Sequence, residues 1–351
     1  MDTEPVKLAI VGCGAITRMA HLPALLCSAK LDLSALIDSS HESAEGLAAD
    51  FGLRCRLATN LSDVLDEAEG VVIATPNHTH HSLALAALER GKPVFVEKPL
   101  TTTYSDAEHL VRVAEQNRSW IAVGYTSRHF PSVRLLKDLL TTGYVGSVRS
   151  FYFEAGSSGG WDPVSGYSLH RGQSGGGVLV VKGSHFLDRM LYWFGEPASV
   201  EFQDDSHGGV EANCRGEMTF DNELGSFRGR FFLSKTINLR NTLFVDCSEH
   251  LVILPEADTL NVTLRPKTRP DLKLKVSTDG PPGSGEKGTY FRVQLEEFAD
   301  RIRGARADVT VDGRFAARSV RLIERLYELR RTLPEPWLLY RKDTPASHVQ
   351  T

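Results

Sequence analysis

The sequence of 351 residues is short of cysteine, has no long apolar run and carries little net charge. Its five cysteines are scattered without Cys-x-x-Cys spacing, which indicates reduced packing residues and fits the cytoplasm. No apolar run approaches the roughly 20 residues of a membrane span, and the first residues show no signal-peptide pattern. The net charge of -4 favours neither nucleic acid nor an anionic membrane as a partner. These absences predict a cytoplasmic globular protein without a nucleic-acid or membrane partner.

The chain is long enough for two domains, and its first part has the pattern of an α/β fold. Short apolar segments alternate there with helical patterns, at residues 7–11, 31–37, 70–75, 93–96 and 120–123. Strands that alternate with helices form parallel sheets with right-handed crossovers. Residues 1–125 are therefore predicted to form a doubly wound Rossmann domain that binds a dinucleotide.

The pattern changes after residue 125. Strand candidates then follow one another mostly without helices between them, at residues 147–154, 198–202, 212–220, 225–233 and 242–247. Helical patterns return at residues 290–303 and 314–333. Such an order is typical of an antiparallel or mixed sheet. Residues 126–351 are predicted to form a second domain, for substrate binding and oligomerisation.

A glycine-rich turn follows the first strand and opens a helix, as a dinucleotide fingerprint requires. Gly12 permits a tight turn, and Gly14 lets the backbone approach a pyrophosphate. The helix N-terminus at Ala15 and Ile16 then supplies N–H donors and a partial positive charge. Thr17 stands where the third glycine is usual. The alternative is a glycine turn that holds no ligand.

Asp38 ends the second strand, about 20 residues beyond the glycine turn. A carboxylate at that place accepts hydrogen bonds from the adenosine ribose and repels a 2′-phosphate. NAD is therefore the predicted cofactor, and NADP is the second choice. The alternative for Asp38 is a turn residue at the end of a strand.

Lys98 follows the apolar run of residues 93–96 within Glu97-Lys98-Pro99. The carboxyl end of a buried parallel strand is where open α/β sheets bind ligands. A charged amine held there is costly unless it has a partner or a task. Lys98 is therefore a catalytic candidate, and the alternative is a lysine paired with a nearby carboxylate.

Several motifs together resemble the Gfo/Idh/MocA oxidoreductase family. They are Ala74-Thr75-Pro76-Asn77-x-x-His80, Gly91-Lys92-Pro93, Glu97-Lys98-Pro99-Leu100, Val123-Gly124-Tyr125, Gly143-x-x-Gly146 and Ser174-Gly175-Gly176-Gly177 ahead of Gly183-Ser184-His185-x-x-Asp188. The resemblance implies an N-terminal Rossmann domain and a C-terminal α/β domain on a large, mostly antiparallel sheet. That sheet often forms the oligomer interface, so a homo-oligomer, a dimer or tetramer, is predicted.

The resemblance also implies an activity and a site. The family mostly oxidises or reduces a secondary alcohol or ketone of sugars, cyclitols and related polyols with NAD(P). Lys98 and His185 match the lysine and histidine that line its active site. The turn residues Thr75, Pro76, Asn77 and His80, with Glu97 and Lys98, are assigned to the cofactor.

One position departs from the family pattern. Many family dehydrogenases have an aspartate four residues before the histidine, and here that residue is Val181. Valine can neither orient an imidazole nor hold a proton. The neighbouring Lys182 either shares a helical face with His185, which would disfavour protonated histidine, or points to solvent.

The predicted mechanism assigns two roles. His185 exchanges a proton with the substrate oxygen, and Lys98 stabilises the developing negative charge on that oxygen. His78, His80 and His81 lie at a strand-to-helix turn with no evident carboxylate or cysteine partner, so no metal site is predicted.

Other polar residues are substrate-pocket candidates. Arg128 and Arg171 suit a carboxylate or phosphate, and Trp161 and Tyr167 suit a sugar ring. The remaining candidates are His129, Asp162, His170 and Gln173. A solvated or packing role is the alternative for each.

Three functions stay open from the sequence. The first is a sugar or cyclitol dehydrogenase, and the second is a ketoreductase for a nucleotide-linked or otherwise modified sugar. The third is a redox-silent NAD(P)-binding sensor or scaffold, which Val181 favours and which Lys98 and His185 disfavour.

Overall fold

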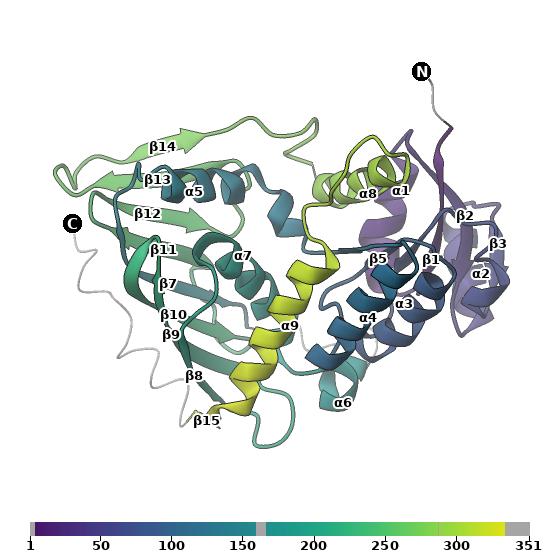
Figure 1. The fold of residues 1–351 in the computed structure, drawn as a ribbon, viewed down its shortest axis with the longest axis horizontal. Helices are drawn as coiled ribbons and strands as arrows, with labels where there is room; N and C mark the ends of the chain where they lie inside the picture. Colours follow the sequence, from purple (N-terminus) through teal and green to yellow (C-terminus); the bar gives the residue numbers. More distant parts are fainter. Residues whose placement is uncertain (1–3, 159–165, 287, 334–351) are drawn as a thin grey trace.

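The computed structural model describes residues 4–158, 166–286 and 288–333. Two β-sheets lie side by side, with helices packed on and between them (Figure 1). The six-stranded sheet stands at the right of Figure 1 and the nine-stranded sheet at the left, with helix α9 running between the two halves.

The first sheet is parallel throughout its six strands. Its strands are β1 (Val6–Val11), β2 (Leu31–Ile37), β3 (Arg56–Ala58), β4 (Gly70–Ile73), β5 (Val94–Val96) and β6 (Ile121–Val123). The spatial order is β3-β2-β1-β4-β5-β6. From β1 the chain adds strands towards one edge of the sheet, and from β4 it adds strands towards the other, so the order of connection reverses between β1 and β4. Ligands of open α/β sheets bind outside the carboxyl ends of the strands at such a reversal. The predicted Rossmann fold is confirmed.

Short helices connect these strands. They are α1 (Leu22–Leu26), α2 (His41–Asp50), α3 (His80–Glu89) and α4 (Tyr104–Gln116), with the shorter turns η1 (Thr17–His21), η2 (Leu61–Asp63) and η3 (Asn77–Thr79). Two helices start at side-chain caps: the Ser40 hydroxyl accepts from the Ser43 N–H, and the Thr103 hydroxyl accepts from the Asp106 N–H.

The second sheet is mixed and mostly antiparallel, as predicted. Its strands are β7 (Val148–Gly156), β8 (Ser199–Asp204), β9 (Asn213–Asn222), β10 (Gly225–Ser234), β11 (Thr242–Cys247), β12 (His250–Pro255), β13 (Asn261–Pro266), β14 (Leu274–Ser277) and β15 (Arg330–Thr332). The order is β14-β13-β12-β11-β7-β10-β9-β8-β15, and only the pairs β7–β10 and β8–β15 are parallel. Strands β12 to β14 were not predicted from the sequence.

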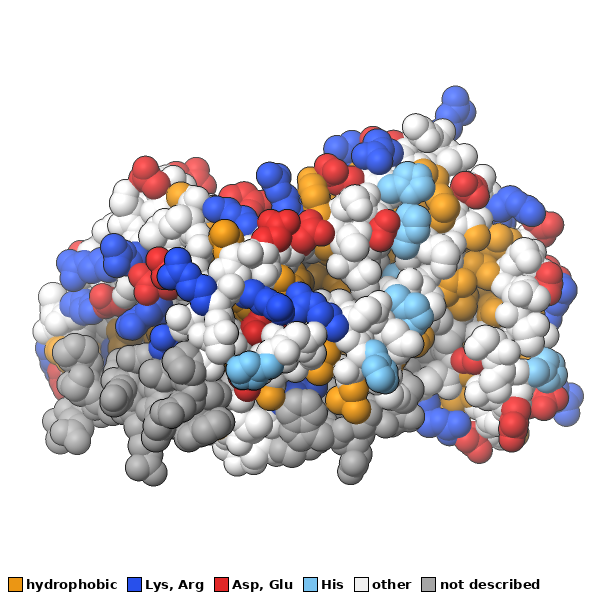
Figure 2. Space-filling model, turned by 90° about the horizontal axis from the view of Figure 1, so that it is seen from below, with side chains coloured by type: hydrophobic (Ala, Val, Ile, Leu, Met, Phe, Trp, Pro, Cys, Tyr) orange, Lys and Arg blue, Asp and Glu red, His pale blue; other side chains and the backbone are white. Residues whose placement is uncertain are grey.

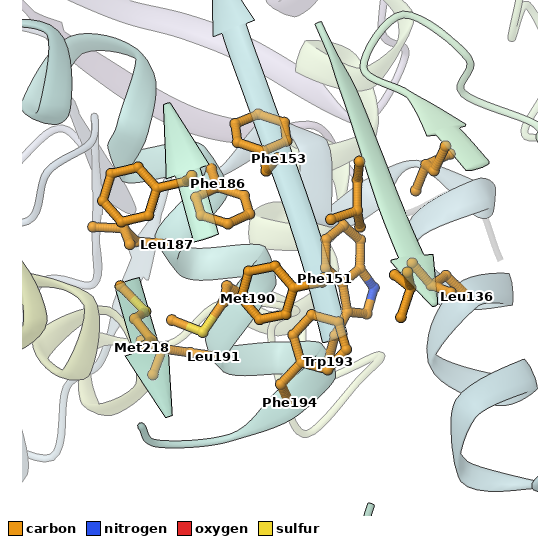
Figure 3. Packing of buried hydrophobic residues seen from close by; sticks show 14 of the residues in the cluster. Leu136, Phe151, Phe153, Phe186, Leu187, Met190, Leu191, Trp193, Phe194 and Met218 are labelled. Atoms are coloured by element: carbon orange, nitrogen blue, oxygen red, sulfur yellow. The ribbon is translucent and has the colours of Figure 1, made fainter. Parts of the chain in front are cut away.

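Helix α7 (Ser184–Phe194) packs on this sheet through an aromatic core. Phe186 stacks on Phe153 of β7 with ring centroids 4.1 Å apart, and Phe194 stacks on Phe151 at 4.7 Å (Figure 3). The aromatic core therefore fixes the helix that carries His185.

The remaining helical segments are η4 (Thr126–His129), α5 (Pro131–Thr141), η5 (Gly166–Leu169), α6 (Arg171–Ser174), η6 (Leu179–Gly183), α8 (Thr289–Ile302) and α9 (Gly313–Glu328).

The last helices return to the Rossmann sheet. Phe298 of α8 packs against Phe95 of β5, with ring centroids 6.0 Å apart. Helix α9 packs against both α4 and α7, and so joins the two halves. The Rossmann core thus includes residues far beyond 125, and the division of the chain at that residue stays a prediction.

The helix predicted over residues 314–333 is wrong at its end, because α9 stops at Glu328. The next residues form β15, which pairs with β8. Leu333 is buried against Phe232 and Leu239, and its N–H donates to the Asp204 carbonyl at 2.7 Å. Tertiary pairing there outweighs the helical pattern.

Neither positive nor negative charge dominates the face of the molecule that is seen from below. Basic and acidic side chains are interspersed over that face (Figure 2). Within the described ranges, no helix has the length and apolar character needed to cross a membrane.

Candidate active site

The glycine-rich turn after β1 is built as its sequence predicts. Gly12 has a φ of +98°, and a Cβ there would lie 2.4 Å from the Ala74 carbonyl oxygen. Any side chain would clash with the end of β4. Thr17 is buried and its hydroxyl donates to the Gly12 carbonyl at 2.5 Å, so the residue that replaces the third glycine closes the turn. At Gly14 a Cβ would meet nothing within 4 Å, which leaves open space for a ligand.

Asp38 lies beside this turn at the end of β2. One carboxylate oxygen accepts from the Cys13 N–H at 2.8 Å, and the other accepts from the Ser40 N–H at 3.0 Å. The carboxylate is therefore oriented by main-chain donors, while its other lone pairs remain able to accept from a ligand.

The turn after β4 lies against the glycine-rich turn. The Asn77 amide donates to the Ser174 carbonyl at 2.8 Å, which links this turn to α6. The buried His80 ring lies between two carbonyl oxygens, Pro99 O at 2.8 Å from Nδ1 and Thr75 O at 3.0 Å from Nε2. Burial lowers the pKa of His80. His80 thus positions the two loops, and both of its nitrogens are occupied by protein groups.

Glu97 is buried and its carboxylate is engaged within the protein. One oxygen lies 2.7 Å from Nε2 of the buried His21, and the other accepts from the Lys98 N–H at 3.1 Å. Burial opposes ionisation, but the hydrogen bond and charge of His21 together with Lys98 hold the Glu97 pKa below its usual value. Glu97 therefore anchors the loop that presents Lys98, and a direct role in binding the cofactor stays a prediction.

Lys98 extends from the carboxyl end of β5 towards the second domain. Its ammonium group donates to the main-chain carbonyl of Val181 at 2.9 Å. Burial lowers the pKa of Lys98, nearby Glu97 opposes that shift, and nearby Lys235 adds to it. Val181 has no side-chain carboxylate, and its main-chain carbonyl accepts the hydrogen bond from Lys98.

His185 lies in the first turn of α7, close enough to Lys98 for the lysine charge to act on its pKa. Its ring meets Tyr125 edge-on, with centroids 5.9 Å apart, and its Nδ1 has no hydrogen-bond partner among the described residues. Burial lowers the pKa of His185 well below its usual value, and the charges of Lys98 and Arg189 add to this effect. The imidazole is therefore neutral near pH 7 and able to accept a proton.

A π-helical turn, η6, leads into α7 and carries Val181 and Lys182. Its wider spacing means that Val181 and His185 do not follow a regular α-helical turn. The Lys182 ammonium donates to the Ser157 hydroxyl at 3.0 Å, so it faces the end of β7 rather than His185.

Buried Glu211 holds this π-helical turn in place. Its carboxylate accepts from the N–H groups of Gly177 and Leu179, each at 2.9 Å, and from the Tyr327 hydroxyl at 2.8 Å. A Cβ at Gly177 would lie 2.1 Å from the Glu211 carbonyl oxygen, which explains a glycine there. Glu211 was missed from the sequence because it lies more than thirty residues from the turn it supports.

Arg128 and His129 lie inside the protein. The Arg128 guanidinium contacts Asp188 at 3.2 Å and lies over the rings of Tyr192 and Phe315. Burial lowers the pKa of His129 to about 3, with Arg134 and Arg128 contributing. Because Arg128 is already occupied by a carboxylate and two rings, we do not propose a substrate role for it.

The other predicted pocket residues are spread around α6. Arg171 lies 4.6 Å over the Tyr327 ring, and its Nη1 has no partner among the described residues. Tyr167 lies near enough to Glu97 for that charge to add to burial in raising the tyrosine pKa. His170 and Gln173 are exposed. Trp161 and Asp162 lie outside the described residues.

Two residues at strand ends of the second sheet had no sequence signal. Lys235 follows β10 and its charge adds to the lowered pKa of Lys98, and Ser157 follows β7 and accepts from Lys182. In the part of the chain that the structure describes, no group of three or more His, Cys, Asp or Glu side chains is arranged to hold a metal ion.

Two parts of the chain match models of known protein families. Residues 6–125 match the family model described as "Oxidoreductase family, NAD-binding Rossmann fold", and residues 133–249 match the "GFO/IDH/MocA C-terminal domain". The chain belongs to the Gfo/Idh/MocA oxidoreductase family. The resemblance drawn from the sequence motifs is thereby confirmed.

Within this family the chain is similar to sugar dehydrogenases. It is 28% identical over 190 residues to glucose-6-phosphate 3-dehydrogenase of Bacillus subtilis, covering 54% of this chain and 53% of that one. It is 28% identical over 225 residues to D-glucoside 3-dehydrogenase of Escherichia coli, covering 61% and 62%. The chain spans about half the length of the curated relatives it matches. A levoglucosan dehydrogenase solved with NADH and levoglucosan shares the fold, with a TM-score of 0.78 at 19% identity over 93% of this chain and 97% of that one.

Proposed function

We propose that this protein is an NAD-dependent oxidoreductase that transfers a hydride between nicotinamide and a secondary alcohol or ketone of a sugar, cyclitol or related polyol. One observation carries the proposal: the Lys98 ammonium, at the carboxyl end of β5, donates to the carbonyl of Val181, four residues before His185, and lies close enough to the neutral His185 imidazole for its charge to lower the histidine pKa. Relatives named as sugar dehydrogenases support the substrate class.

The residues around the glycine turn fit a dinucleotide. Open space at Gly14 and the start of η1 suit a pyrophosphate, and the oriented carboxylate of Asp38 suits a ribose with free hydroxyls. The turn at Thr75 and Pro76 would lie along the nicotinamide half. When bound, NAD supplies the hydride acceptor or donor.

The chain itself supplies the handling of proton and charge. In alcohol oxidation the neutral imidazole of His185 would take the hydroxyl proton of the substrate. The Lys98 ammonium donates a hydrogen bond to the same oxygen as negative charge grows on it. In the reverse direction His185 returns the proton to the ketone oxygen.

A panel of sugars, cyclitols and polyols tests this function. Each compound is mixed with the protein and NAD, and reduction is followed at the nicotinamide absorbance band. Ketoses and keto sugars with NADH test the reverse direction and the ketoreductase alternative. Tight NADH binding without turnover of any compound would favour the sensor or scaffold alternative instead. The predicted homo-oligomer and cytoplasmic location stay predictions.

The pH profile of kcat/KM is expected to fall at both acid and basic pH, and each fall should lie below the ordinary pKa of the group that causes it. His185 must be neutral to accept a proton, so activity in alcohol oxidation is lost only as pH falls through its lowered pKa, below 6.5. Lys98 must be charged, so activity is lost as pH rises through its own lowered pKa, below 10.5. Rates measured across pH for the wild type and His185→Gln check this. An acid limb centred at or above 6.5, or one that persists in His185→Gln, would contradict the assignment.

Asp38→Asn is expected to weaken NADH binding by about tenfold and to reduce the discrimination against NADPH. The reason is that the variant loses the carboxylate charge, which favours a ribose without a 2′-phosphate. Asparagine keeps one acceptor oxygen for the turn. The matched control is Asp32→Asn, an exposed aspartate at the start of β2. Both dinucleotides are titrated by fluorescence. An unchanged ratio of the two affinities would rule out this role for Asp38.

A further inference from the structure

One buried glutamate binds the main-chain donors at the start of the helical segment that carries His185. This segment runs from η6 into α7 without a break, and the first N–H groups of a helix have no partner within it. The Glu211 carboxylate accepts from the N–H groups of Gly177 and Leu179, each at 2.9 Å. The Glu211 carbonyl accepts from the Val178 N–H at 2.9 Å. Three successive donors are therefore held by one residue from outside the segment.

Helix α9 adds a further hydrogen bond to this glutamate. The Tyr327 hydroxyl donates to the Glu211 carboxylate at 2.8 Å, and a Cβ at Gly176 would lie 1.9 Å from that hydroxyl oxygen. The Tyr327 ring lies 4.6 Å from the Arg171 guanidinium and meets the Phe202 ring edge-on at 5.7 Å. Burial raises the pKa of Glu211, and its hydrogen bonds oppose that shift. Glu211 is therefore bonded to both the η6 turn and α9.

The η6 turn reaches Lys98 through two more hydrogen bonds. The Val181 N–H donates to the Gly177 carbonyl at 3.0 Å, and the Val181 carbonyl accepts from the Lys98 ammonium at 2.9 Å. Gly177 is therefore bound to Glu211 through its N–H and to Val181 through its carbonyl. His185 follows Val181 by four residues on the same segment. A displacement of this turn would move both the acceptor of Lys98 and the imidazole of His185.

We propose that Glu211 is a positioning residue for the proposed hydride transfer. It fixes the η6 turn, which sets the Val181 carbonyl against Lys98 and the imidazole of His185 in the site. Tyr327 shares this role, because it bonds the same carboxylate from α9. This inference rests on the proposed function, and it assigns neither residue a contact with substrate or cofactor. Misplacement of reacting groups by about 1 Å can lower a rate by about 10²-fold, so a small shift of the turn should reduce turnover.

Glu211→Gln tests the effect on turnover. Glutamine has nearly the same shape but only one acceptor oxygen, so one of the two main-chain N–H groups loses its partner. For a sugar that the wild type oxidises, kcat is expected to fall by about tenfold or more, with KM and NADH affinity close to the wild-type values. The matched control is Glu297→Gln on α8, which alters another buried carboxylate that accepts a main-chain N–H, that of Thr310 at 2.9 Å. The control should lose stability in thermal melts and keep the wild-type kcat.

Tyr327→Phe tests the same role without a change of charge. Burial raises the pKa of Tyr327 well above its usual value, so the hydroxyl is neutral over the pH range of the assay. The variant removes one hydrogen bond from Glu211 and keeps the ring. The loosened turn holds the Val181 carbonyl less firmly, and that carbonyl bonds the charged form of Lys98. The Lys98 pKa should therefore fall further, so the decline of kcat/KM at basic pH should move to lower pH, with kcat reduced by about fivefold.

The basic decline reports on Lys98 because the other groups around it are kept. The charged and titratable groups that interact with Lys98 are unchanged in this variant; they are Glu97, Lys235 and His185. A general loss of stability leaves the pKa of the folded protein where it is. The matched control is Tyr104→Phe, which removes a hydroxyl that donates to another glutamate carboxylate, also at 2.8 Å, on α4. This control should leave the pH profile unchanged.

The rates and pH profiles separate the outcomes. A basic decline that does not move in Tyr327→Phe would overturn the inference even where kcat falls, and the proposed function would stand. Wild-type kcat in Glu211→Gln would overturn it in the same way. If Glu211→Gln does not fold, the profile of Tyr327→Phe decides alone. No turnover of any sugar or keto sugar by the wild type, in either direction, would overturn both the inference and the proposed function.

Discussion

Lys98→Ala is expected to lower turnover by about 10² to 10³-fold while NADH affinity stays close to that of the wild type. The proposed mechanism has the ammonium group stabilise the substrate oxygen as charge develops on it, whereas the glycine turn and Asp38 are proposed to hold the dinucleotide. Loss of a transition-state contact lowers kcat and kcat/KM together. Steady-state rates and a separate NADH titration measure the two effects.

The same strand offers a matched control for that variant. Lys92 stands before β5, at the opposite end from Lys98, and its ammonium also donates to a main-chain carbonyl, Ala68 O at 2.8 Å. Lys92→Ala removes the same side chain and the same kind of hydrogen bond outside the site, and should leave kcat unchanged. Full turnover in Lys98→Ala would show that the lysine is not catalytic.

Arg128→Met is expected to destabilise the folded protein by about 3–5 kcal/mol. The change leaves Asp188 buried without the guanidinium that contacts it at 3.2 Å, and both side chains are almost fully buried. Burial already raises the Asp188 pKa to about 6 against the effect of Arg128. Without Arg128 that pKa rises further, so the loss of stability should shrink as pH falls and Asp188 becomes protonated. Chemical denaturation at two pH values measures this.

Two controls separate the buried pair from ordinary surface charge. Arg269→Met breaks the exposed Arg269–Asp271 pair and should leave the free energy of unfolding close to that of the wild type. In the double variant Arg128→Met, Asp188→Leu, much of the lost stability should return, because no buried charge remains unpaired. A stable Arg128→Met protein with a raised KM would instead restore the substrate role predicted from the sequence.

The Rossmann half could be predicted because its signals are local. Gly12, Gly14 and Asp38 stand at spacings that a strand, a turn and a helix impose, and the structure places all three at one edge of the sheet. The alternation of strands and helices likewise predicts a parallel sheet, which the structure has. Each of these inferences needed only neighbouring residues and the rule for where parallel sheets bind ligands.

The missed contacts join residues that are distant in the sequence. Lys98 and Val181 are 83 residues apart, and His21 and Glu97 are 76 apart. No local pattern shows that a main-chain carbonyl accepts from the lysine, or that Glu97 is already paired. The burial of Arg128 against Asp188 has no sequence signal either, because a sequence does not show which side of η4 faces the core. Strands β12 to β14 were missed, and their pairing depends on partners within the sheet.

Transfer of deuterium tests the central claim most directly. A sugar that the protein oxidises, carrying deuterium on the carbon of the reacting hydroxyl, is incubated with NAD, and the reduced nicotinamide is analysed by mass spectrometry for the wild type and for Lys98→Ala. The account predicts that wild-type protein places one deuterium on the nicotinamide and slows when the carbon is deuterated, and that the variant forms the same product far more slowly. Reduced nicotinamide without deuterium, or bound NAD that is never reduced by any sugar, would contradict it.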